Sequence, residues 1–153
     1  MKSYFKELIY KFKELFVLLK KLMLIPKINE ALGIRLYRWQ IDFIFFDKEI
    51  PPDIRGRRAN GKTTAQILKV LLSYGEPVLL PNWGTISYIH SNIKKVGRCT
   101  INTRNFRSIN SYCYFVGLGV DIAHYRFFKN ELIKIMNILN SKGIKTTEII
   151  IAR

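Results

Sequence analysis

The chain has 153 residues, which is the size of about one domain. Hydrophobic residues make up 48% and aromatic residues 13%, so the chain can bury a core and is not a disordered tail. Its net charge of +15 indicates a polyanionic partner, first nucleic acid and second an anionic membrane surface. Cys99 and Cys113 follow no C-x-x-C spacing, so we expect reduced thiols, no disulfide framework and a cytoplasmic protein.

Residues 3–24 have the period of an amphipathic helix, and Pro26 is expected to end it. Its apolar residues at helical spacing are Phe5, Leu8, Ile9, Phe12, Leu15, Phe16, Leu19 and Leu22. Packing on its own domain or on a partner is the favoured interpretation, and attachment to a membrane surface is the alternative. No apolar run approaches the ~18 residues of a spanning helix. We divide the chain into a helical extension, 1–26, and a main domain, 27–153.

The main domain alternates between helix and strand patterns. A helix is expected at Arg38–Asp47, followed by a short strand at Asp53–Arg55, although Pro51 and Pro52 are poor strand residues. The later patterns predict helices at 64–73, 85–96 and 125–140 and strands at 77–81, 112–120 and 146–152. This alternation predicts an α/β fold of the P-loop type, with a mostly parallel sheet and crossover helices.

The segment 55–64, RGRRANGKTT, matches the P-loop pattern G-x-x-x-x-G-K-[ST] without a gap. Two glycines allow the backbone to wrap a phosphate, and the following helix points its positive end at the same group. Lys62 is expected to reach the phosphates of ATP, and Thr63 to ligate Mg²⁺. The expected phosphate cradle is Gly56, Arg58, Ala59, Asn60, Gly61, Lys62, Thr63 and Thr64. The alternative is a basic, glycine-rich turn before a helix.

A second candidate region is basic and aromatic. No acidic residue occurs between Glu76 and Asp121. The cations of this span are Lys94, Lys95, Arg98, Arg104 and Arg107, and the same stretch carries Phe106, Tyr112 and Tyr114. Cations contact a nucleic-acid backbone and aromatic rings stack on bases, so this stretch predicts nucleic-acid binding. These residues do not distinguish DNA from RNA, and DNA is the favoured partner. A solvated basic face is the alternative.

Together these features resemble the N-terminal ATPase domain of phage large terminases, over roughly residues 36–152. The resemblance rests on an arginine-rich P-loop, a strand ending in Asp121, and Gln40 after an aromatic residue one helix upstream. In such motors a glutamine in that place reads the adenine edge, which an amide can do because it both donates and accepts. The resemblance implies that Asp121 is the Walker B aspartate. It also implies that Arg57 or Arg58 stabilises charge on the γ-phosphate.

The chain departs from the terminase pattern at the catalytic acid. Asp121 is followed by Ile122 where the family has glutamate, so the acid that activates water is missing unless Glu131 supplies it. Gly117 and Gly119 also weaken the expected strand. The hypothesis is therefore a nucleic-acid-associated NTP-binding protein, located in the host cytoplasm if viral, which is an ATPase if Lys62, Arg57 and Asp121 form an active site.

Two other classes of function stay open at this stage. The first is a basic nucleic-acid-binding or interaction protein without catalysis, in which the GKT segment only starts a helix. The second is a membrane-surface protein held by residues 3–24. A homo-oligomer or a larger motor assembly is also compatible with the hypothesis, because ring motors complete their sites from neighbouring subunits.

Overall fold

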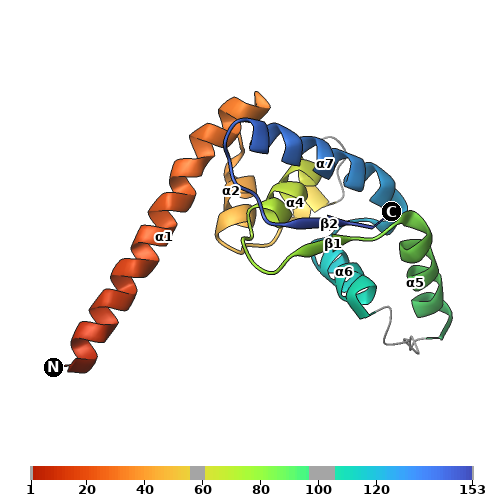
Figure 1. Ribbon diagram of the computed structural model, residues 1–153, viewed down its shortest axis with the longest axis horizontal. Helices are drawn as coiled ribbons and strands as arrows, with labels where there is room; N and C mark the ends of the chain where they lie inside the picture. The colour runs from red at the N-terminus through yellow and green to blue at the C-terminus, as the bar shows by residue number, and fades with distance from the viewer. Residues whose placement is uncertain (1, 56–60, 97–105, 153) are drawn as a thin grey trace.

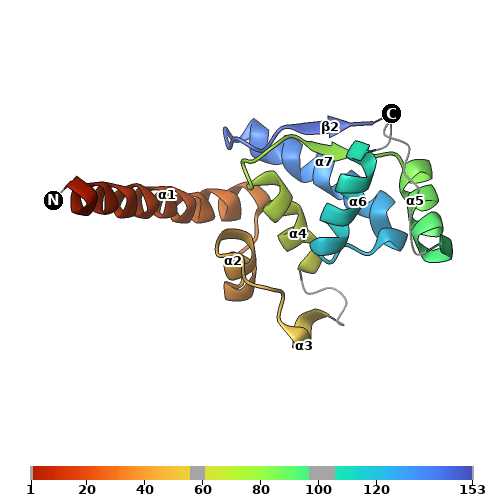
Figure 2. The same ribbon diagram turned by 90° about the horizontal axis from the view of Figure 1, so that it is seen from below.

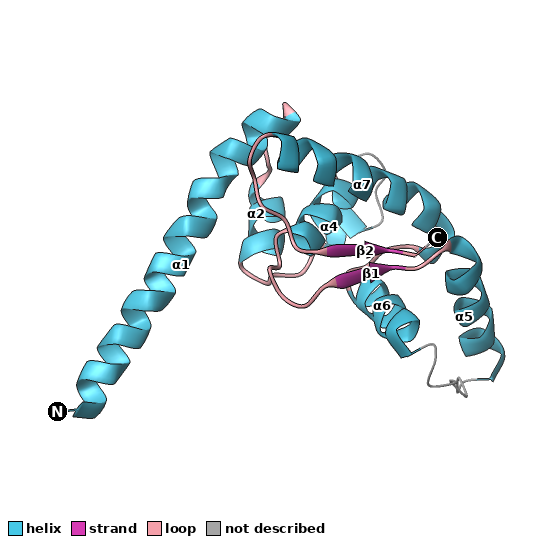
Figure 3. Ribbon diagram, viewed as in Figure 1, coloured by secondary structure: helices cyan, strands magenta, loops and turns pink. Residues whose placement is uncertain are grey.

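The structure is a computed structural model of the chain, and it describes residues 2–55, 61–96 and 106–152. Figure 1 shows its elements in chain order, and Figure 3 shows how few of them are strands. The elements are α1 (Lys2–Leu32), α2 (Arg38–Phe45), α3 (Pro52–Arg55), α4 (Lys62–Leu71), β1 (Val78–Leu80), α5 (Trp83–Val96), α6 (Phe106–Gly117), the 3₁₀ helix η2 (Ile122–His124), α7 (Tyr125–Ser141) and β2 (Ile149–Ile151).

The predicted P-loop α/β fold with a mostly parallel, multi-stranded sheet is wrong. In the described residues the sheet is a single parallel pair, β1 with β2, in which Val78 is opposite Ile149. The strand predictions at 77–81 and 146–152 are confirmed in shortened form by this pair. The strands predicted at 53–55 and 112–120 are both helical instead, and this removes the sheet from around the GKT segment.

The segment before the GKT motif is the short helix α3. Proline has no N–H and a fixed φ, so it is unfavourable inside a strand but well suited to the first position of a helix. Pro52 occupies that first position, and Ile54 N and Arg55 N both donate to Pro51 O, at 3.0 and 3.2 Å. The two prolines therefore specify a helical turn where a strand was predicted.

The run predicted as a strand at 112–120 is the second half of α6 and its end. Gly119 has φ +78°, a left-handed conformation that glycine adopts without strain. Its N–H donates to Val116 O, and Val120 N donates to Phe115 O, both at 2.9 Å. This is the glycine cap that commonly ends a helix. The glycines that weaken a strand here terminate a helix.

The predicted helices are confirmed, with changes at their ends. Residues 38–47, 64–73, 85–96 and 125–140 correspond to α2, α4, α5 and α7. α5 begins two residues early, at Trp83, because Asn82 Oδ1 accepts a hydrogen bond from Thr85 N at 2.8 Å. The N-terminal helix is also confirmed, but Pro26 does not end it, and α1 continues to Leu32.

The core of the protein is built around α4. Ala65, Ile67, Leu68, Val70 and Leu71 are all 0% exposed. α2 and α7 both pack against α4, and α6 packs against β1 and α5. Most of this helix is therefore buried, and its N-terminal end opens onto a cavity described below. That arrangement fixes the position of the GKT residues relative to the rest of the body.

α1 packs on the rest of the protein at its C-terminal end and is exposed over its N-terminal part. Its C-terminal part packs on α7, with Ile28 fully buried. Figures 1 and 2 show the N-terminal part extending away from the rest of the chain in both views. None of the helices in the described part of the chain combines the length and the apolar character needed to cross a membrane.

Candidate functional site

The first turn of α4 carries the GKT residues. Gly61 is the residue before the helix, with a left-handed φ of +82°, and it has no side chain that could cap the helix. The first N–H groups of a helix have no acceptor within the helix, and the helix dipole makes that end positive. Lys62, Thr63 and Thr64 therefore present backbone donors and side chains at an end that favours anions.

Gln40 lies directly behind this turn. Its Nε2 donates to Gly61 O at 3.0 Å, and its Oε1 accepts from Tyr37 N at 2.8 Å. A Cβ added at Gly61 would lie 2.5 Å from Gln40 Nε2, so residue 61 must be glycine for this packing. Both ends of the amide are occupied within the chain. A contact between Gln40 and adenine would require it to release these bonds.

Lys62 is held toward the end of α3. Its Nζ donates to Arg55 O at 2.7 Å. Arg55 in turn donates from Nε to Ile50 O at 3.0 Å and pairs through Nη2 with Glu49 Oε2 at 2.8 Å. The ammonium group of Lys62 therefore spans the two ends of the segment 56–60. The predicted residues Gly56, Arg57, Arg58, Ala59 and Asn60 form that segment, which lies outside the described residues.

A cavity of about 1160 Å³ opens at the start of α4. Its lining includes four of the predicted phosphate-binding residues, Gly61, Lys62, Thr63 and Thr64. It also includes Asp121, which lies far from them in the sequence. The wall opposite α4 comes from the end of α6, η2 and the first turns of α7. The structure thus brings the GKT residues and Asp121 to one cavity, although the sheet predicted to do so is absent from the described residues. Gln40 does not line it.

Asp121 stands at the start of η2 and not at the end of a strand. Its Oδ1 accepts from Ala123 N at 3.0 Å, and its Oδ2 lies 3.7 Å from His124 Nε2. The carboxylate is therefore a helix cap with one oxygen toward an imidazole, and it is largely exposed. It is open to solvent and to a ligand on the cavity side.

Glu131, the possible replacement acid, lines the cavity. His124, Phe127 and Phe128 also line it, and none of these three is among the predicted site residues. Phe127 and Phe128 follow His124 by three and four residues, and Glu131 follows them by four and three, so the four residues share one side of the segment that enters α7. This helical spacing after Asp121 is the signal that could have identified His124 and the two rings.

Gln66 connects the two walls of the cavity. Its side chain is buried, and its Nε2 donates to Leu118 O at 3.2 Å and to Gly119 O at 2.9 Å. The glycine cap of α6 is thereby tied to the second turn of α4. This bond sets the spacing between the GKT residues and Asp121, which follows the cap closely in the chain.

The acids of the cavity do not form a metal site alone. In the described part of the chain, no group of three or more histidine, cysteine, aspartate or glutamate side chains is placed to hold a metal. Mg²⁺ commonly uses one or two carboxylates together with phosphate oxygens and waters, and not an all-protein cage. The donor set of Thr63 and Asp121 is therefore compatible with Mg²⁺ carried in with a phosphate ligand.

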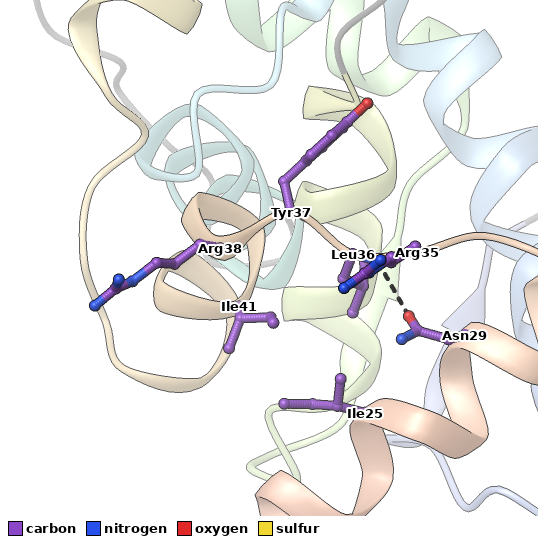
Figure 4. A pocket seen from close by; sticks show the side chains of 7 residues that line it. All are labelled: Ile25, Asn29, Arg35, Leu36, Tyr37, Arg38 and Ile41. Carbon is purple, nitrogen blue, oxygen red and sulfur yellow. Dashed lines mark hydrogen bonds between the residues drawn. The ribbon is translucent and has the colours of Figure 1, made fainter.

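A second cavity, of about 610 Å³, lies where α1 meets the start of α2. In Figure 4, Ile25 and Ile41 line it, Arg38 points outward, and Leu36 N donates to Asn29 Oδ1 at 3.1 Å. This hydrogen bond ties the end of α1 to the chain that leads into α2. The cavity belongs to a joint between helices.

The predicted nucleic-acid contacts cannot be placed in this geometry. Arg98 and Arg104 lie outside the described residues. Lys94 and Lys95 belong to α5 and Arg107 belongs to α6, but their side chains are outside the described part of the structure. Their role stays a prediction from the sequence.

Comparisons of this chain with models of known protein families, with curated proteins and with solved structures found no match. The resemblance to terminases therefore rests on the sequence features given above, and the roles that it implies stay predictions.

Proposed function

We propose that the cavity at the start of α4 binds the phosphates of a nucleoside triphosphate together with Mg²⁺. One observation carries the proposal: Lys62 and Thr63 of the GKT motif line the same cavity as Asp121, which is distant in sequence. The proposal does not depend on the terminase fold. It depends on a left-handed glycine, a helix start, a lysine and a carboxylate around one cavity.

Each group has a distinct task in this proposal. The N–H groups of the first turn of α4 donate to phosphate oxygens, with the helix dipole in their favour. Lys62 Nζ exchanges its bond to Arg55 O for a phosphate oxygen, which is a charge-assisted and therefore stronger partner. Thr63 and Asp121 are the residues that would hold Mg²⁺, which neutralises phosphate charge.

The rest of the cavity suits a nucleoside. Phe127 is 58% exposed and lines the cavity, so its ring is open for stacking on a base. Glu131 is partly buried on the same wall, and in this proposal its carboxylate accepts a proton from a water if hydrolysis occurs. Binding is the primary proposal, and hydrolysis through Glu131 is its extension.

The test is thermal unfolding with and without millimolar Mg-ATP. A ligand at a hundred times its dissociation constant adds about 2.7 kcal/mol, which raises the melting temperature of such a domain by several degrees. We expect this rise in the wild type and its loss in Lys62→Ala. Removal of Mg²⁺ by a chelator should reduce the rise in the wild type, and Thr63→Ala should reduce it in the presence of Mg²⁺.

A charge-matched control is essential because a protein of charge +15 attracts any polyanion. Lys142→Ala removes the same charge from the exposed end of α7, away from the cavity. It should keep the full temperature rise. If the wild type shows no rise, or if Lys62→Ala keeps it, nucleotide binding at this cavity is refuted.

A second function, nucleic-acid binding, is supported by the net charge of +15. It predicts DNA binding whose affinity falls steeply with salt, because each neutralised phosphate releases counterions. Lys62→Ala should leave this binding nearly unchanged, whereas replacing Lys94, Lys95 and Arg107 by alanine should flatten the salt dependence. Binding assays at several salt concentrations separate the two functions, since only the cavity responds to Lys62.

A further inference from the structure

The N-terminal part of α1 exposes a continuous apolar surface. Residues 2–23 include no buried residue. Their exposed large apolar side chains are Tyr4, Phe5, Leu8, Ile9, Tyr10, Phe12, Leu15, Phe16, Val17, Leu19, Leu22 and Met23. A monomeric protein rarely leaves more than a few hundred Å² of contiguous apolar surface in water. This surface therefore requires a partner.

The sequence of this part repeats every seven residues. Phe5-Lys6-Glu7-Leu8 recurs as Phe12-Lys13-Glu14-Leu15 and then as Leu19-Lys20-Lys21-Leu22. A further apolar residue follows each unit, at Ile9, Phe16 and Met23. In heptad notation these residues occupy positions a, d and e through three heptads. We call this set of nine side chains the heptad stripe.

A strict seven-residue repeat favours a helix as the partner. An α-helix has 3.6 residues per turn, so the stripe drifts by ~20° per heptad unless two helices wind around each other. A helix that lies on a flat membrane surface has no need of a seven-residue repeat, because it can stay straight with a period of 3.6 residues. The repeat therefore indicates a left-handed helix pair, in which each a and d side chain enters a gap on the other helix.

We propose that the heptad stripe binds the heptad stripe of a second copy of this chain, so that the two α1 helices form a pair. The charges of this segment are compatible with such a pair. Lys6, Lys13 and Lys20 lie at position b, and Glu7 and Glu14 lie at position c, outside the seam. All five charges therefore stay in water when the two stripes meet.

The size of the stripe is sufficient for a specific interface. Phe5, Phe12 and Phe16 are 66%, 73% and 57% exposed. At ~200 Å² for a whole aromatic side chain, these three rings alone leave about 400 Å² open. Six aliphatic side chains continue the same stripe and bring it toward the ~800 Å² per partner that a specific complex buries.

The stripe ends where α1 joins the body. Met23 is its last residue, Pro26 follows, and Ile28 is fully buried in the core. Proline donates no backbone hydrogen bond, so the helix is weakened at the boundary between its exposed and its docked part. Parallel pairing would place both bodies at the same end of the helix pair. This inference stands independently of nucleotide binding.

The test uses the full chain in physiological salt and measures its molar mass in solution across a range of concentrations. Leu15 and Val17 make a matched pair, since they are 53% and 51% exposed but lie at position d and on the opposite side of the helix. We expect a dimer for the wild type and for Val17→Glu. Leu15→Glu should weaken the dimer roughly a hundredfold or more, because it buries unpaired charge in the interface.

Orientation is tested by cross-linking. In a chain with Cys99→Ser and Cys113→Ser, Phe5→Cys places a thiol near the N-terminus of the stripe. Mild oxidation should give covalent dimers if the helices are parallel, because the two thiols then meet. In an antiparallel pair they would be separated by most of the length of the stripe, and no covalent dimer would form.

Other results would overturn the inference. A monomeric wild type that binds anionic vesicles through the stripe would assign the surface to a membrane. A dimer that survives Leu15→Glu would place the interface elsewhere, and a monomer without vesicle binding would leave no role for a second copy. A larger assembly that only Leu15→Glu disrupts would refute the two-helix form.

Discussion

The projecting part of α1 and the body use the same kinds of side chain in opposite environments. Phe12 on α1 is 73% exposed, whereas Phe115 on α6 is 0% exposed. Both lie on helices with an apolar stripe, so composition does not distinguish them. The difference is that α6 has β1 and α5 packed against it, whereas residues 2–23 of α1 include no buried residue. Burial within one chain depends on whether the fold supplies an opposing surface.

The largest expected effect comes from exchanging one ring in each region. Phe115 packs against Tyr125 and Phe128, with ring centroids 5.7 and 5.6 Å apart. Phe115→Ala should lower the free energy of unfolding by about 3–5 kcal/mol, because it removes buried surface and leaves a cavity. Phe12→Ala should change it by less than about 0.5 kcal/mol in a monomeric chain.

Urea unfolding in the Leu15→Glu background measures both variants without a contribution from self-association. In the wild-type background, Phe12→Ala should cost more than in the monomeric background, because it also weakens the helix pair. The cost of Phe115→Ala should be the same in both backgrounds. If Phe12→Ala and Phe115→Ala lower the free energy of unfolding by similar amounts in the monomeric background, the heptad stripe is packed within its own chain and is not exposed.

Local signals in the sequence were sufficient for most helices and insufficient for the sheet. The apolar period of α4 and α7 identifies each helix from its own residues. The run 112–120 has strand-like composition, but a short apolar run fits either class, and Gly117 and Gly119 are expected only to weaken a strand. Gly119 in fact ends α6. The elements that pack on a segment decide between helix and strand, and the local sequence does not specify those elements.

The candidate site shows the same limit in a different form. The GKT spacing specifies a glycine and a helix start, which are local features, and both occur at Gly61 and Lys62. The approach of Asp121 depends on Gln66 binding the end of α6, which is a contact between distant residues. The sequence therefore suggested which residues would meet, through a resemblance, but not the helical framework that brings them together.

An intermediate effect is expected at Gly61, which lies where the core meets the cavity. Gly61 and Gly143 both have left-handed φ, +82° and +78°. Alanine at either position is strained by about 1–2 kcal/mol. A Cβ at Gly143 would meet nothing within 4 Å, whereas at Gly61 it would meet Gln40. Gly61→Ala should therefore destabilise the protein more than Gly143→Ala does, by roughly 1 kcal/mol or more.

A double-mutant cycle isolates the contact with Gln40. In a Gln40→Ala background, the clash between residue 61 and Gln40 is absent. Gly61→Ala and Gly143→Ala should then lower the free energy of unfolding by similar amounts. If Gly61→Ala and Gly143→Ala already match in the wild-type background, Gln40 does not pack against Gly61 in solution.

The smallest expected effect separates two tyrosines by the cause of their pKa shifts. On α1, the hydrogen bond to Glu14 raises the pKa of Tyr10 above its ordinary value. In the core, burial raises the pKa of Tyr125 much further, and its hydroxyl donates to Pro81 O at 2.9 Å. Tyr10 is exposed, so Glu14→Gln or added salt should lower its pKa toward the ordinary value. Neither change should affect Tyr125, because its shift comes from desolvation.

The consequence for stability follows from the raised pKa of Tyr125. Below about pH 10 the tyrosine is neutral in both states, and above it only the unfolded chain ionises, so stability falls by up to about 1.4 kcal/mol per pH unit. Phenylalanine cannot ionise. Tyr125→Phe should be about 1 kcal/mol less stable near neutral pH, from the lost hydrogen bond. As the pH rises above 10, the free energy of unfolding of Tyr125→Phe should first equal and then exceed that of the wild type. Tyr10→Phe should follow the wild type throughout, and parallel curves for all three proteins would show that the Tyr125 hydroxyl is hydrated.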